Sequence, residues 1–326
     1  MKFSKLVLAA LLVLALVGCS GTAPDKARPG GAADGGAFPV TIATKFGEVV
    51  VEQQPTTVVA LGWGDAEVAL ALGVQPVGAS DWLAFGGEGV GPWAAGRYDK
   101  PPMLIATMEP DFEAIAALQP DLILDTKSSG DRARYDRLSE LAPTIGVPAG
   151  GDAYLTSTRQ QTTMIAQALG RTAQGEALLT KLDTAFAEAA AAHPQWKGQT
   201  VSSVTRTSET WGAYIEGSER VQFMQNLGFV QNPAIAELPT GGSGFSVSLS
   251  PEQLRRIDAD LIVAFPIYID TSQITADPLF TAVPAVAQGR AVVIDGDLSQ
   301  AYSLGTVESQ LYALDKIIPE LEKATR

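Results

Sequence analysis

Two stretches of this chain, residues 111–124 and 250–263, repeat one short pattern, and this repeat constrains the fold more than any other feature. In each stretch a glutamate, Glu113 or Glu252, stands eight residues before an aspartate that opens an apolar Leu-Ile run. Short apolar runs of this kind indicate buried strands, and the residues before them have helical spacing. The repeat therefore predicts a helix–strand unit in each half of the chain and two lobes of similar construction.

Each unit also carries the signal that starts a helix. Asp111 can accept hydrogen bonds from the first free backbone N–H groups of its helix. Ser250, Pro251 and Gln253 form a capping-box pattern with proline at the first helical position. The two glutamates of the repeat then both fall at the second position of a helix.

Strand and helix signals alternate on both sides of one long helical segment. We expect strands at residues 40–42, 48–51, 57–62, 75–79, 121–124, 143–147, 200–205, 260–264 and 291–294, and helices at 65–72, 111–118, 135–141, 221–227, 251–257 and 307–323. Such alternation is typical of a mostly parallel sheet. The predicted fold is α/β, with two lobes, each a mostly parallel sheet covered by helices, joined by one long α-helix.

The long segment is rich in Ala, Leu, Gln, Glu and Lys and contains no proline before Pro194, which ends it. A break near Gly170 leaves open a shorter helix before the long one. The chain is thus predicted to divide into a signal peptide, a tether, an N-terminal lobe, a connecting helix and a C-terminal lobe, at residues 1–18, 19–37, 38–155, 156–193 and 194–326.

The N-terminus has the pattern of an export signal. Lys2 and Lys5 precede an apolar run, residues 6–17, that is shorter than the roughly 20 residues of a membrane span. The run ends in Leu-Val-Gly-Cys, which resembles the lipobox of a bacterial lipoprotein and predicts lipidation of Cys19. An ordinary signal peptide that happens to end near a cysteine is the alternative. The following residues are rich in Gly, Ala, Pro and Asp, a composition typical of a flexible tether.

Charge and composition exclude several functions. The formal net charge is −13, which disfavours nucleic acid as a partner. Cys19 is the one cysteine, so no internal disulfide is expected. His193 is the one histidine, which argues against multi-histidine metal sites and against a Ser-His-Asp triad. The sequence contains no Gly-x-Ser-x-Gly elbow and no phosphate-binding Gly-x-x-x-x-Gly-Lys loop. We therefore expect a protein that is not an enzyme.

The order of these features resembles the iron-siderophore and cobalamin class of substrate-binding lipoproteins of ABC importers. The resemblance is carried by residues 58–65, by residues 72–78, by the two glutamate-to-aspartate units and by the single long helix. In that family a glutamate of each lobe pairs with arginines of the permease, and Glu113 and Glu252 match those positions. The alternative is that both glutamates only complement a helix dipole, worth about 0.3–1 kcal/mol.

Ligands of open α/β sheets bind beyond the carboxyl ends of the strands, so the loops there supply the candidate site. The candidates for ligand binding are Trp63, Asp65, Trp82, Phe85, Trp93, Arg97, Lys127, Arg206, Trp211, Tyr214, Phe245, Tyr268 and Tyr302. Aromatic side chains offer area for a bulky chelate, and an arginine offers forked donors to its oxygens. Packing within a lobe is the alternative role for any one tryptophan, while Trp196 is expected to be structural.

Arg206 is the central charged candidate. In hydroxamate-binding members of the resembled family an arginine near this point contacts iron-bound oxygens, which implies the same role for Arg206. A salt bridge with Glu209 or Glu216 is the alternative. The scarcity of cations in these loops favours a hydroxamate or mixed ferric siderophore over a highly charged tris-catecholate.

The resemblance as a whole implies a monomer anchored to the cell membrane outside the cytoplasm, with no cofactor, that captures a ferric siderophore and delivers it to a permease. Heme, with a tyrosine ligand such as Tyr214, Tyr268 or Tyr302, and cobalamin stay open as ligands. A lipid-anchored hydrolase or a surface lipoprotein without a transport role are the alternatives from other classes. The long helix between the lobes predicts small lobe movements rather than wide closure.

Overall fold

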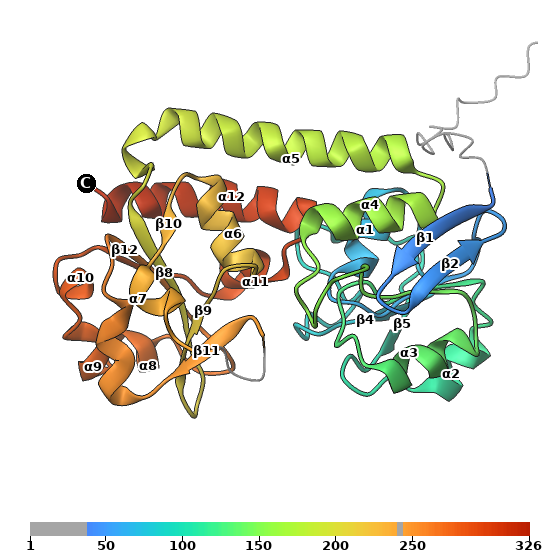
Figure 1. Ribbon diagram of the computed structural model, residues 1–326, viewed down its shortest axis with the longest axis horizontal. Coiled ribbons are helices and arrows are strands. Elements are labelled where there is room, and N and C mark those ends of the chain that lie inside the picture. Colours follow the sequence, from blue (N-terminus) through green and yellow to red (C-terminus); the bar gives the residue numbers. More distant parts are fainter. Residues whose placement is uncertain (1–37, 240–243) are drawn as a thin grey trace, which may run out of the picture. The chain divides into compact units, whose positions relative to one another are not determined.

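The computed structural model describes residues 38–239 and 244–326, and both of these ranges belong to the same structural unit. The predicted signal peptide, the tether and Cys19 lie outside the described residues. Within the described residues no helix is both long and apolar enough to cross a membrane. The α/β fold class with two lobes is confirmed (Figure 1).

The first lobe is built on a parallel sheet of five strands in the order β5-β4-β3-β6-β7. The antiparallel hairpin of β1 and β2 packs on it, with Ile42, Val49 and Val51 in the same core. Its elements are β1 (Val40–Thr44), β2 (Gly47–Val51), β3 (Val58–Ala60), α1 (Asp65–Ala71), β4 (Gly78–Ser80), β5 (Met103–Ile105), α2 (Phe112–Ala117), β6 (Leu122–Leu124), α3 (Arg132–Ser139) and β7 (Thr144–Ile145).

The predicted connecting segment forms two helices, α4 (Thr158–Ala168) and α5 (Thr172–Ala192). Gly170 has a φ of +65°, a conformation that glycine adopts at low cost and that separates the two helices. A Cβ atom at Gly175 would lie 2.5 Å from the Cβ of Ala166, so glycine lets α4 and α5 approach closely. The long helix α5 also packs against α6 and α12 of the second lobe (Figure 1).

The second lobe contains a mixed sheet in the order β11-β9-β8-β12-β13, with β10 paired to β8. Strands β8, β10, β12 and β13 are parallel, whereas β9 and β11 are antiparallel additions that the sequence did not predict. Its elements are η1 (Pro194–Trp196), β8 (Thr200–Arg206), β9 (Trp211–Tyr214), α6 (Glu219–Asn226), β10 (Val230–Gln231), α7 (Pro233–Ala236), β11 (Ser246–Leu249), η2 (Pro251–Ile257), β12 (Leu261–Pro266), α8 (Ser272–Thr275), α9 (Pro278–Thr281), α10 (Pro284–Ala287), β13 (Ala291–Val293), α11 (Gly296–Leu304) and α12 (Val307–Ala324).

The sequence repeat has the same structural role in both lobes. The carboxylate of Asp121 accepts hydrogen bonds from the backbone and hydroxyl of Thr56, at 2.8 and 2.7 Å, just before β3. Asp260 accepts the same pair of bonds from Thr200, both at 2.8 Å, at the start of β8. Each aspartate therefore ties the strand that it opens to the neighbouring strand of its sheet.

The helix-start signals are also confirmed, with one difference. Asp111 accepts from the backbone N–H groups of Glu113 and Ala114, both at 3.0 Å. Ser250 donates its backbone N–H to the Gln253 side chain at 3.1 Å. The second segment, η2, is a 3₁₀ helix rather than the predicted α-helix.

Candidate ligand-binding cleft

Two adjoining cavities lie between loops of the first lobe and loops of the second, and Trp82 and Tyr268 line both of them. The first-lobe cavity measures about 580 Å³ and is otherwise lined by Trp63, Asp81, Ala106, Thr107, Met108 and Glu109. The second-lobe cavity measures about 280 Å³ and is otherwise lined by Leu83, Arg220, Phe265, Pro266, Ile267, Ile269, Gly296, Ser299, Gln300 and Ser303. These loops follow β3, β4, β5, β12 and β13, so the cleft lies at the carboxyl ends of the strands, as predicted.

Aromatic rings form the wall of the first-lobe cavity. The rings of Trp63 and Trp82 stack with centroids 4.0 Å apart and an angle of 7° between their planes. Tyr154, which the sequence analysis did not single out, also stacks on Trp63 at 4.2 Å. Tyr268 is 85 % exposed and has a φ of +55°. Trp63 is therefore stacked between Trp82 and Tyr154, and Trp82 and Tyr268 present the ring surface that a flat or bulky ligand can contact.

Asp65 holds the loop that carries Trp63 and does not face the cleft. It is fully buried, and its carboxylate accepts from the backbone of Gly62 at 3.1 Å, the backbone of Thr126 at 2.9 Å and the Gln161 side chain at 2.7 Å. Burial raises the pKa of Asp65 to about 6. A Cβ atom at Gly62 would lie 2.3 Å from this carboxylate, so the tight turn requires glycine. The structure therefore gives Asp65 a supporting role instead of the predicted contact with ligand.

Arg220, which the sequence analysis missed, is the charged residue of the second-lobe cavity. It is only 7 % exposed, and its guanidinium carbon lies 4.4 Å from the centre of the Tyr214 ring. Its Nε atom is buried without a hydrogen-bond partner, and none of the described acidic residues forms an ion pair with it. A buried cation without an anion is costly, so the arrangement favours a ligand that brings oxygen atoms.

One sequence signal pointed to Arg220. It stands in the first turn of α6, where the helix dipole disfavours a cation.

The buried hydroxyl of Tyr302 donates to the backbone oxygen of Arg220 at 2.8 Å and lies 2.8 Å from the Ser203 hydroxyl. Burial raises the pKa of Tyr302 above its usual value. Tyr302 thus positions the start of α6. It does not line the cleft, contrary to the prediction.

Arg206 does not line either cavity, although it follows strand β8 at the expected place. Its Nη1 atom donates to the backbone oxygen of the adjacent Thr207 at 2.8 Å, and its guanidinium lies 5.9 Å from the Trp211 ring centre. Among the described residues neither Glu209 nor Glu216 forms the alternative salt bridge with it. The arginine of the cleft is therefore Arg220, not Arg206.

Three aromatic candidates of the second lobe line neither cavity. Trp211 and Tyr214 lie on strand β9 instead of a loop, and both are buried. The Trp211 indole donates to Asp277 at 2.9 Å, while the Tyr214 ring supports Arg220. Phe245 is partly buried against the lobe core. Trp211 and Tyr214 therefore pack inside the second lobe, whereas the Phe245 ring contacts Tyr154 of the first lobe edge-on at 6.3 Å.

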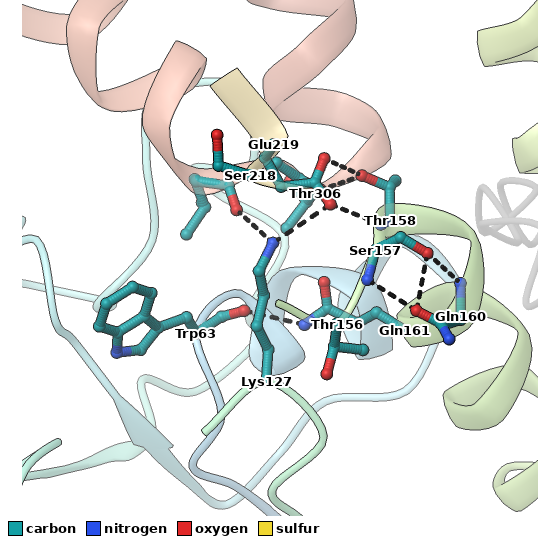
Figure 2. Close-up of polar contacts among 12 residues, drawn as sticks. Trp63, Lys127, Thr156, Ser157, Thr158, Gln160, Gln161, Ser218, Glu219 and Thr306 are labelled. Atoms are coloured by element: carbon teal, nitrogen blue, oxygen red, sulfur yellow. Dashed lines mark hydrogen bonds and ion pairs between the residues drawn. The ribbon is translucent and has the colours of Figure 1, made fainter. Parts of the chain in front are cut away.

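Four further candidates lie at the junction of the lobes. The Trp93 indole donates to Glu67 at 2.7 Å, and its ring packs on Tyr312 of α12 at 5.3 Å. Phe85 packs edge-on against Trp93 at 5.7 Å. Arg97 of the first lobe forms an ion pair with Glu308 of α12. The fourth, Lys127, belongs to the buried network shown in Figure 2.

Glu219 is the centre of that network (Figure 2). Its carboxylate accepts from the backbone and hydroxyl of Thr158, at 2.8 and 2.9 Å, and from the Gln310 side chain at 3.2 Å. The Lys127 ammonium lies 3.5 Å from the same carboxylate and 3.5 Å from the backbone oxygen of Leu304. Burial lowers the pKa of Lys127, against the effect of Glu219. The network joins both lobes to the connecting helices.

The two glutamates of the repeat, by contrast, are exposed at the second position of their helices. Hydrogen bonds from its own backbone N–H and from the Ser250 side chain lower the pKa of Glu252. The Glu113 carboxylate has no partner among the described residues. Neither glutamate is needed to hold its lobe together. In the described part of the chain no group of three or more His, Cys, Asp or Glu side chains forms a metal site.

Two α/β lobes, one long connecting helix and an aromatic cleft between the lobes define a solute-binding protein. The chain belongs to the periplasmic binding protein family, whose model matches residues 58–298. It is therefore an extracytoplasmic solute-binding component and not an enzyme.

Three individual proteins that are similar to this chain show which kinds of solute-binding protein it resembles. The probable siderophore-binding lipoprotein YfiY of Bacillus subtilis is 26 % identical over 283 residues, with 82 % of each chain covered. A periplasmic solute-binding protein of Mycobacterium smegmatis superposes with a TM-score of 0.77 at 24 % identity, covering 88 % of this chain and 99 % of the other. Streptococcus pneumoniae PiaA in complex with ferrichrome gives a TM-score of 0.75 at 25 % identity, covering 87 % and 98 %.

Proposed function

We propose that the protein captures a ferric siderophore outside the cytoplasmic membrane and delivers it to the permease of an ABC importer. One observation carries the proposal, namely a buried arginine without an anionic partner, Arg220, on the wall of an aromatic cleft. A relative named as a siderophore-binding lipoprotein and a similar structure that holds ferrichrome support the same ligand class.

In the proposed complex Arg220 donates hydrogen bonds to oxygen atoms of the chelate. Trp63, Trp82 and Tyr268 cover its apolar parts, because aromatic rings supply contact area at low entropy cost. One cationic side chain suits a chelate of low charge, which favours a hydroxamate or mixed siderophore over a tris-catecholate. In this binding mode Arg220, and not Arg206 as the sequence analysis expected, contacts the oxygen atoms of the chelate.

Delivery would use the exposed glutamates of the repeat. Glu113 and Glu252 stand on separate lobes, so a permease with two basic sites can sense the distance between them. The lipobox-like sequence supports an anchor on Cys19, which would keep the protein beside the membrane that holds the permease. We expect the anchored protein to be a monomer. The buried junction around Glu219 supports small lobe movements on binding.

Tryptophan fluorescence tests the proposal, because Trp63 and Trp82 line the cleft. Residues 33–326 would be titrated with ferrioxamine B, ferrichrome, a ferric catecholate, ferric citrate, heme and cobalamin. We expect saturable quenching by a ferric siderophore. Arg220→Gln should weaken that binding about 10- to 100-fold, the effect of losing a charged hydrogen bond worth about 1.5–3 kcal/mol.

Arg206→Gln is the matched control, since Arg206 also lies over an aromatic ring of the second lobe and also has a buried Nε atom without a partner, but lines no described cavity. Its dissociation constant should stay within about twofold of the wild type. Equal effects of the two variants would contradict the proposed role of Arg220. Quenching by heme alone would replace the ligand, with Tyr268 as the one predicted tyrosine that reaches the cleft.

A further inference from the structure

Charges of opposite sign are separated along the cleft. The charged residues that line the first-lobe cavity are Asp81 and Glu109, both acidic. Arg220 is the charged residue that lines the second-lobe cavity. Trp82 and Tyr268 line both cavities, so one ligand that contacts these two rings can reach both ends.

The acidic end has the chemistry of a cation site. Asp81 is fixed in its loop, because its carboxylate accepts from the backbone N–H groups of Phe85 at 2.9 Å and Gly86 at 2.7 Å. Glu109 is exposed on the opposite loop. Trp63 is stacked between Tyr154 and Trp82, so Trp82 is the indole that can present a ring face beside these carboxylates. Aromatic faces together with carboxylates attract ammonium groups through cation–π and ionic interactions.

A nearby basic residue does not cancel this charge. Arg134 donates to the backbone oxygen of Thr107 at 2.9 Å, close to the first-lobe cavity. Its guanidinium also forms a two-point ion pair with the buried carboxylate of Asp125, at 2.7 and 3.0 Å. The pair is neutral as a unit, so the acidic lining of the cavity keeps its sign.

We infer that the cleft selects a ferric chelate that carries a pendant cationic group. The oxygen-rich metal end lies against Arg220, and the cationic group lies in the first-lobe cavity among Trp63, Trp82 and Glu109. The inference rests on the proposed function and specifies its ligand. Arg220, more than nine-tenths buried and with an Nε atom that lacks a partner, supports the oxygen-rich end of this chelate, whereas Asp81 and Glu109 support its cationic end.

Ferrioxamine B and its N-acetyl derivative are a matched pair of probes. Both hold iron in the same hydroxamate chelate, but acetylation converts the pendant ammonium into a neutral amide. Residues 33–326 should bind ferrioxamine B about 5- to 30-fold more tightly than the acetylated form, as expected for a partly desolvated cation–π contact with an added ion pair. The advantage should shrink at high salt.

Glu109→Gln locates the effect. This variant should weaken binding of ferrioxamine B about two- to fivefold and leave the acetylated chelate unchanged. Glu140→Gln is the control, because Glu140 is another exposed glutamate of the first lobe that lines neither cavity. Unchanged thermal unfolding of both variants would show that folding is intact.

The outcomes separate this inference from the proposed function. Equal affinity for the two probes overturns the inference and leaves siderophore capture standing. Binding of ferrichrome or ferric citrate without binding of either probe has the same consequence. A folded protein that binds no ferric chelate of the panel overturns the proposed function, and the inference with it.

Discussion

Replacing Glu219 with alanine should lower the free energy of unfolding by about 3–5 kcal/mol, because this side chain holds the buried junction of the lobes. Glu219 is 8 % exposed and accepts hydrogen bonds from Thr158 and Gln310. Its nearest cation, Lys127, is 2 % exposed and lies 3.5 Å away. The substitution leaves that ammonium buried without its counter-ion, and burial already lowers the pKa of Lys127.

The assay is thermal unfolding of residues 33–326, followed by circular dichroism near neutral pH. A loss of 3–5 kcal/mol should lower the midpoint by about 5–15 °C for a chain of this size. The double substitution Lys127→Met with Glu219→Gln removes both charges and should recover at least half of the loss. Asp183→Ala is the control, since the Asp183–Arg159 pair is even shorter, at 2.6 Å against 3.5 Å, but exposed. It should change the free energy of unfolding by no more than about 1 kcal/mol.

Two results would refute this reasoning. A Glu219→Ala midpoint within about 2 °C of the wild type would show that the network contributes little to stability. A double variant less stable than Glu219→Ala alone would show that the Lys127 charge is not the source of the loss.

Two further predictions concern pH and delivery. Glu67 accepts from Gly91, Trp93 and Thr306 at the lobe junction, and burial raises its pKa from 4.5 to about 7. Because the pKa of Glu67 is raised in the folded state, the stability that its protonated side chain contributes is complete below about pH 4.5 and is lost as pH rises through about 7. The wild-type protein should therefore lose stability between about pH 5 and 8, and Glu67→Gln should reduce that loss by up to roughly 3 kcal/mol. Urea titrations across this pH range measure the effect. A pH profile that the substitution leaves unchanged would contradict the prediction. The double substitution of Glu113 and Glu252 by alanine should abolish uptake of the iron chelate by cells and leave the dissociation constant of the chelate unchanged. A weakened affinity for the chelate would contradict the proposed role of the two glutamates in docking to the permease.

Individual strands and helices could be predicted from the sequence wherever the segment itself carries a pattern, such as an apolar run or a helix cap. Buried apolar runs predicted β6 and β12, and caps predicted the helices that precede them. The glycine at position 170 marked the break between α4 and α5. Strands β9 and β11 were missed because Gly212 interrupts the first and serines alternate with apolar residues in the second, so neither is an apolar run like β6. Their extended conformation depends on pairing with each other across the chain.

The sequence by itself determined the two-lobed α/β plan, the loops at the strand ends and the exposed glutamates of the repeat. Only the tertiary structure decided which of the loop side chains face the cleft. Trp63, Trp82 and Tyr268 do, whereas Lys127 and Trp93 meet partners from distant segments at the lobe junction. The physical reason is that burial and pairing depend on what packs against a residue. A sequence pattern records the neighbours along the chain, while the partners of Lys127 arrive from α6 and α11.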